Sequence, residues 1–333
     1  MNFSMMLQRK LLTLAVTLSL IGGVSISRLV SAQEQKYPSR VITLVIPYAA
    51  GGQTDMMARI LAEKLAVVLK KPVVVENRGG AAGSLAARMV ARAAPDGYTL
   101  IFGSGGPMSI NPVLRKGEVG YDPIADFTPV AYVATSPNLI AANPSFPAKT
   151  VAELIAMAKT QPGKLNIGTT QGSGPDMMSK LFRYQTGIDY LSIPYPSAAP
   201  LINDVLGGHV PVLIDGVIAL QQHIAANKLV AIGISSAQRL STMPTVPTIA
   251  ETLPGFESNS WFSVFAPART PHEIVMKLNA GINEVLSLPD VKERYIALGA
   301  VIVGGPPEKL RDHLAAELVQ WKKLVQDTGM KID

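Results

Sequence analysis

The chain has 333 residues, of which 48% are hydrophobic and 16% charged, a composition that excludes a disordered protein and allows a large core in about two lobes. Its formal net charge is +6, but half of this excess lies in the first 32 residues, and the remainder is too mildly basic to indicate nucleic-acid binding. The lack of cysteine excludes disulfides, thiol nucleophiles and a lipid-modified cysteine anchor.

The N-terminus has the three parts of a secretory signal. Arg9 and Lys10 precede an apolar run over 11–24, and small residues follow near Ala32. A run of this length is short for the ~20 residues that a spanning helix needs, although a membrane anchor stays open as the alternative. We expect a signal peptide over residues 1–32, cleaved near Ala32, and a mature protein in the periplasm.

The first elements alternate between strand and helix. A β-branched run over 41–47 predicts a buried strand, an amphipathic segment over 54–71 predicts a helix, and 72–77 predicts a second strand. A helix over 84–94 and a strand over 98–104 repeat the unit. This alternation is typical of a mostly parallel sheet with helices on both faces.

From about Thr135 the alternation restarts as a second lobe. We expect strands at 138–145, 164–170, 190–195, 211–216 and 229–235. Helices are expected at 150–163, 175–187, 199–208 and 218–228, with Gly163 and Gly187 as the C-terminal caps of the first two.

The last part of the chain is mainly helical. A Pro-rich segment around Pro247 precedes predicted helices at 271–286 and 307–326, and these have too few strands beside them for a third domain. We therefore expect lobe one over 33–135, lobe two over 136–247, and a second crossover and a return to lobe one over 248–333. The fold class is then α/β with two crossovers and a cleft between two lobes, where such sheets bind ligands.

Two Gly-rich turns carry the functional signal. Gly51 and Gly52 allow close backbone approach, and the helix that starts near Thr54 directs its free N–H groups into the same space. A second turn, GTTQGSGPD, follows the strand at 164–170, with Pro175 at the first helical positions and Ser173 or Gly174 near the cap. Each turn alone could be a tight connection, but one in each lobe indicates a carboxylate held across the cleft.

Other signals are weak. The chain has no GxSxG nucleophile elbow, and its GGAAGS segment lacks the spacing of a dinucleotide site, so no cofactor is expected. The adjacent Met177 and Met178 are expected in the core, and Trp261 is a candidate for a hinge or a cleft wall. The histidines are dispersed, which predicts surface residues and no metal site; they are His209, His223, His272 and His313.

Several separate stretches resemble one known family. They are YPSRVITLVIPYAAGGQTDMMAR, VVVENRGGAAGS, APDGYTLIFGS, INPVLRK, YDPIADFTPVA, IPYPSAAPLINDVLGGHV and APARTPHEIVMKLN. From about Tyr37 to the C-terminus, the sequence is similar to the substrate-binding receptors of the tripartite tricarboxylate transporter system, the Bug-type periplasmic proteins. The resemblance implies a Venus-flytrap periplasmic-binding-protein fold, a carboxylate held by the two turns, and transfer of the ligand to a membrane permease.

The resemblance also implies the ligand-binding residues. They are Tyr48, Ala49, Gly52, Gln53, Thr54 and Asp55 in the first turn, Thr170, Gly172, Ser173 and Gly174 in the second, and Ser197, Ala198 and Asp215 beside them. The sequence departs from the family at Asp176 and Met177, where relatives commonly carry His and Leu. Asp176 is either a favourable acid at a helix start or a ligand contact that accepts a proton from the ligand.

These features predict a monomeric binding receptor for a small carboxylate, such as a dicarboxylate, an aromatic acid or an amino acid, without enzymatic activity. Two alternatives remain open. One is an extracytoplasmic sensor for a membrane kinase, and the other is a secreted α/β enzyme, for which no nucleophile beside a base can be assembled.

Overall fold

The computed structural model describes residues 37–328, so the predicted signal peptide lies outside the described residues. From Arg40 on, the chain builds a ten-stranded sheet in the order β2-β1-β3-β9-β4-β7-β5-β6, with β8 and β10 paired to β4. Within residues 37–328, no helix has the length and apolar character to cross a bilayer.

Lobe one begins with the predicted strand–helix alternation. Its elements are β1 (Ile42–Ile46), α2 (Gln53–Leu69), β2 (Val73–Asn77), the short η2 (Ala81–Gly83), α3 (Ser84–Ala91), β3 (Thr99–Ser104), η3 (Gly106–Ile110) and α4 (Asn111–Leu114). Strand β1 pairs in parallel with both β2 and β3, and α2 buries Met57, Leu61 and Leu65. The parallel arrangement predicted for these strands is confirmed.

Lobe two repeats the alternation. Its elements are α5 (Val151–Thr160), β5 (Asn166–Thr170), α6 (Gly174–Thr186), β6 (Leu191–Tyr195), α7 (Ala198–Leu206), β7 (Val212–Gly216), α8 (Val217–Ala225) and β8 (Val230–Ile234). Gly187 caps α6 with a φ of 66°, as predicted. The cap predicted at Gly163 is wrong, because α5 already ends at Thr160 and the positive φ of Gly163 belongs to the turn that follows.

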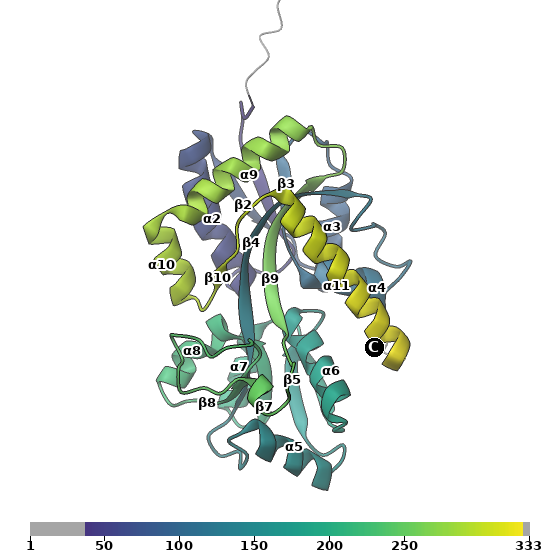
Figure 1. Cartoon of the computed structure of the whole chain (residues 1–333), viewed down its shortest axis with the longest axis vertical. Helices are drawn as coiled ribbons and strands as arrows, with labels where there is room; N and C mark the ends of the chain where they lie inside the picture. The colour runs from purple at the N-terminus through teal and green to yellow at the C-terminus, as the bar shows by residue number, and fades with distance from the viewer. Residues whose placement is uncertain (1–36, 329–333) are drawn as a thin grey trace, which may run out of the picture. The chain divides into compact units, whose positions relative to one another are not determined.

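Two long antiparallel strands join the lobes (Figure 1). Residues 127–137 of β4 (Phe127–Ala142) pair with β9 (Asn259–Pro267) and β10 (Val301–Ile302), and residues 138–142 pair with β7 and β8. Neither this uninterrupted strand nor the antiparallel pairing around it was predicted, since only a strand over 138–145 was expected here. The boundaries expected after Thr135 and Pro247 stay a prediction.

The core of lobe two lies on both faces of the sheet. In β4, Ile140 and Ala142 pack with α5 and α6 on one face. Leu139 and Ala141 pack with α7 and α8 on the other, because neighbouring residues of a strand point to opposite faces.

The helices after β9 pack on lobe-one elements. They are α9 (His272–Ser287), α10 (Pro289–Ala297) and α11 (Pro307–Thr328), whereas the short η4 (Ile249–Glu251) lies before β9. Helix α9 packs on α2 and β4, and α11 packs on β4, η3 and α4. Helix α10 was not predicted; it begins at Pro289, only three residues after the predicted end of the helix before it. This position of α11 brings its side chains to the cavity described below.

Candidate functional site

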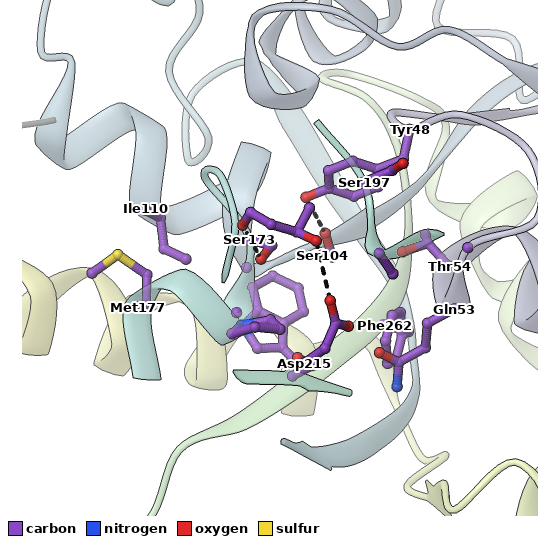
Figure 2. Close-up of a pocket in the computed structure, with 18 of the residues that line it drawn as sticks. Tyr48, Gln53, Thr54, Ser104, Ile110, Ser173, Met177, Ser197, Asp215 and Phe262 are labelled. Atoms are coloured by element: carbon purple, nitrogen blue, oxygen red, sulfur yellow. Dashed lines mark hydrogen bonds between the residues drawn. The ribbon is translucent and has the colours of Figure 1, made fainter. Parts of the chain in front are cut away.

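A cavity of about 240 Å³ lies where the strand ends of both lobes meet (Figure 2). Its walls include the two Gly-rich turns, the start of α7, the end of β7, the first residues of β9 and one face of α11. The volume is below the roughly 300–1,000 Å³ of pockets for drug-sized ligands, so the cavity suits a small molecule.

The first turn leads from β1 into α2. Gly51 adopts a φ of 86°, and its N–H donates to the Asp55 carboxylate over 2.9 Å. Asn77 on β2 donates to both Asp55 and the carbonyl of Tyr48, and Arg59 pairs with Asp55 from one helical turn away. These bonds, led by the one from Arg59, outweigh the effect of burial and lower the pKa of Asp55. An ionised Asp55 therefore stabilises the conformation of the turn through these bonds.

The second turn leads from β5 into α6 and is held in a similar way. Ser173 is the N-cap of α6, and Pro175 occupies its first turn. The Asp176 carboxylate accepts hydrogen bonds from Gly172 N–H over 3.1 Å and from Thr169 Oγ1 over 3.3 Å, and it pairs with Lys180. As in the first turn, a carboxylate near the start of the helix accepts a hydrogen bond from a backbone N–H of the turn and so stabilises its conformation.

Three helices start at the cavity. The lining includes Gly52 and Gln53 at the start of α2, Gly174 at the start of α6 and Ala198 at the start of α7. The first N–H groups of a helix lack partners within it and carry the positive end of its dipole. Among the described residues that line the cavity there is no lysine, arginine or histidine. The site therefore favours an anion through backbone dipoles rather than through a buried cation.

Gln53 supplies a further donor. Its side chain lies against Gly216 at the start of α8, and its Nε2 is buried without a hydrogen-bond partner among the described residues. A buried amide donor of this kind costs about 1–3 kcal/mol unless a partner arrives. A ligand oxygen in the cavity would remove that cost.

Two acids also line the cavity. Burial raises the pKa of Asp215 to about 6, against the hydrogen bonds that its carboxylate accepts from Gly216 N–H and from Thr170 Oγ1. Burial raises the pKa of Glu317 on α11 to about 7, while Trp261 Nε1 donates to its Oε2 over 2.6 Å and opposes that shift. Both carboxyl groups thus titrate closer to neutral pH than usual.

Residues 57–330 match the model of the tripartite tricarboxylate transporter family receptor. The chain belongs to this receptor family. The resemblance inferred from the sequence is thereby confirmed, and the receptor is similar over almost its whole length to BugT of Bordetella pertussis, with 36% identity over 96% of this chain and 98% of that protein.

Solved structures of relatives share the fold of the receptor. The Rhodopseudomonas palustris protein Rpa4515, solved with adipate, matches with a TM-score of 0.84 and 36% identity over 89% of this chain and 99% of that one. MatC from the same organism, solved with bound malate, matches with a TM-score of 0.81 and 34% identity over 87% of this chain and 100% of that one. The two-lobed periplasmic-binding-protein fold expected from the sequence is confirmed.

The structure brings most of the predicted site residues of the receptor together at the cavity. Those that line it are Tyr48, Ala49, Gly52, Gln53, Thr54, Thr170, Ser173, Gly174, Ser197, Ala198 and Asp215. Their contact with a ligand stays a prediction.

Three predicted residues do not line the cavity. Asp55 and Asp176 face their own turns, as described above, which favours the helix-start interpretation of Asp176 over ligand contact and leaves that choice a prediction. Gly172 instead forms a contact between the lobes. A Cβ atom at Gly172 would lie 2.5 Å from the Cβ of Ala82, and the Gly172 carbonyl lies against Gly106.

Sequence reasoning missed the far wall of the cavity, which includes Ser104, Ile110, Phe262, Glu317 and Trp321. Trp261, expected as a hinge or a cleft wall, is buried and lines the cavity. Met177 and Met178 are both buried, as predicted, although Met177 also reaches the lining.

The surface position predicted for His313 is wrong. Its ring packs against Tyr132 and Trp261, with centroids 4.7 and 5.1 Å away, and burial lowers its pKa to about 4. The sequence does contain a sign of this position, because His313 and Glu317 are four residues apart and therefore lie on the same face of α11. No group of three or more His, Asp or Glu side chains within residues 37–328 is placed to hold a metal ion.

Proposed function

We propose that this receptor captures a small organic carboxylate between its lobes in the periplasm, as a monomer, and delivers it to a tripartite tricarboxylate-type membrane permease. The observation that carries the proposal is the convergence of three helix starts and the unpartnered Gln53 amide on a cavity whose described lining lacks a cationic side chain. The relatives solved with adipate and with malate support the same ligand class.

The physical reason is the cost of desolvation. A carboxylate that enters a buried site must exchange its water for other donors, and fixed N–H groups provide them without a second buried charge. Ser173, Ser197 and Thr54 also line the cavity, and the Ser173 hydroxyl already donates to the Thr170 carbonyl within its own turn.

Thermal-shift screening followed by calorimetry tests the proposal. The mature protein is titrated with mono-, di- and tricarboxylates, aromatic acids and amino acids, and each binder is compared with its methyl ester. A ligand at 100 times its Kd should stabilise the fold by about 2.7 kcal/mol. Esterification of the bound carboxylate should weaken binding at least tenfold; equal binding of acid and ester, or no binding by any acid, would refute a carboxylate receptor.

Delivery and location have their own tests. A strain that lacks the receptor should lose uptake of the radiolabelled ligand, and N-terminal sequencing of the periplasmic protein should start near Gln33. Unchanged uptake would leave binding intact but would refute the transport role.

A further inference from the structure

The cavity has an apolar end that the two turns do not explain. Ile110, Met177 and Trp321 line it and pack with Leu324 in one hydrophobic cluster. Figure 2 shows Ile110 and Met177 on the side of the cavity opposite Gln53 and Thr54. A ligand whose carboxylate meets the helix starts would therefore direct the rest of its body toward this cluster.

Glu317 is the ionisable group at that end. It lies one helical turn before Trp321 on α11, and its carboxyl group accepts a hydrogen bond from Trp261 Nε1 over 2.6 Å. The other groups near it are Ser109, Trp321, Tyr132 and His313. Burial keeps His313 neutral and Tyr132 protonated near neutral pH, and none of the ion pairs among the described residues joins Glu317 to a lysine or arginine.

The charge of Glu317 decides which ligand end can approach. Above its pKa of about 7, it is an anion without a cationic partner, in a wall that is otherwise apolar and aromatic. A second ligand carboxylate would meet like charge at short range with little water to screen it. A hydroxyl or an ammonium group would instead donate a charge-assisted hydrogen bond.

We propose that Glu317, Trp321, Ile110 and Met177 form a second subsite of the same cavity, which selects carboxylates whose apolar body ends in a hydrogen-bond donor over dicarboxylates of the same length. This inference rests on the proposed function, since it assumes that the first carboxylate lies at the helix starts. It makes Glu317 a specificity-determining residue and separates this receptor from the relatives solved with adipate and with malate.

Calorimetry at pH 8 with ligands of matched length tests the subsite. One series is hexanoate, 6-hydroxyhexanoate, 6-aminohexanoate and adipate; the other is 4-(hydroxymethyl)benzoate, 4-(aminomethyl)benzoate and terephthalate. In at least one series, the hydroxy or amino acid should bind at least tenfold tighter than the diacid. Glu317→Gln should tighten the diacid and weaken the amino acid, each by about tenfold. Glu308→Gln, an exposed change on the same helix, should alter neither.

Fluorescence provides a second readout, because the chain has only two tryptophans, Trp261 and Trp321, and both line the cavity. In the parent protein, which keeps the Trp261 hydrogen bond to Glu317, a ligand that reaches the subsite should change the tryptophan emission. A carboxylate that binds without this change, or a diacid that binds tighter than its hydroxy and amino counterparts, would overturn the subsite and leave the proposed function standing. If no carboxylate in the wider screen binds, the proposed function fails, and the subsite fails with it.

Discussion

Gly172 in lobe two contacts Ala82 in lobe one, so adding a methyl group at Gly172 tests whether the lobes close on ligand binding. In Gly172→Ala, the new Cβ would lie 2.5 Å from the Cβ of Ala82, whereas ordinary contacts begin at 3.4 Å, so the turn and lobe one must separate by about 1 Å. Overpacking of this kind destabilises a structure by about 1–3 kcal/mol. Here it destabilises only the closed state, in which the two lobes are in contact. Ligand affinity should therefore fall about 5- to 150-fold.

Gly172 also has a φ of 67°, so alanine adds backbone strain of about 1–2 kcal/mol. That strain is present whether the lobes are open or closed, and it should lower stability without changing affinity. The double variant Ala82→Gly/Gly172→Ala removes the clashing atom and keeps the strain at position 172, although glycine also relieves the strain of Ala82, whose φ is 52°, so affinity rather than stability is the readout.

Calorimetry with a ligand identified by the screen measures all three proteins, and small-angle scattering follows closure. The double variant should regain affinity to within about threefold of the parent, and Gly172→Ala should stay more expanded at saturation. Unchanged affinity of Gly172→Ala, or no recovery in the double variant, would refute the idea that this contact forms on closure.

Three further predictions concern buried or turn-closing acids. The pKa of Glu317 rises from 4.5 in the unfolded chain to about 7 in the fold, so the free energy of unfolding should fall by up to about 3 kcal/mol as pH rises through this window. The lowered pKa of His313 makes the free energy of unfolding rise with pH, the opposite of the effect of Glu317. The test is therefore the difference in the free energy of unfolding between Glu317→Gln and the parent, from denaturant titrations at several pH values. A difference that does not change with pH would contradict the prediction. Binding of a carboxylate near Asp215, whose pKa is already about 6, should raise that pKa further and take up protons near pH 6.5, measured by calorimetry in buffers of different ionisation heat; Asp215→Asn should reduce the uptake and leave the part due to Glu317 in the same cavity, and equal uptake in that variant would exclude Asp215. Asp176→Asn should lower stability by about 1–2 kcal/mol, because it removes a charged acceptor from Gly172 N–H and Lys180, yet change affinity less than threefold; a larger loss of affinity at unchanged stability would point to ligand contact instead.

The sequence predicted the near side of the site because its signals are local. A Gly-rich turn between a strand and a helix, as at Gly51 and Gly52, fixes the backbone within a few residues. Pro175 and Ser173 mark the start of α6 in the same way. The strand–helix alternation then places each turn at the end of a strand, after β1 in lobe one and after β5 in lobe two.

The far wall could not be predicted because it depends on how distant segments pack. The helical pattern around Glu317 and Trp321 identifies an amphipathic helix, but it does not say that one face of α11 would reach the ligand cavity. Local pattern also cannot fix the direction of one side chain, and Asp176 turned toward Gly172 N–H rather than into the cavity. The long strand β4 was missed for a related reason, since its pairing with β9 joins residues more than a hundred positions apart.

A crystal structure of the mature protein with a carboxylate from the screen tests the central claim most directly. We expect the carboxylate oxygens to lie within hydrogen-bond distance, directly or through one water, of donors from both turns, at residues 49–54 and 170–174. A ligand bound with its carboxylate away from these helix starts, or held by a lysine or arginine side chain, would contradict the account.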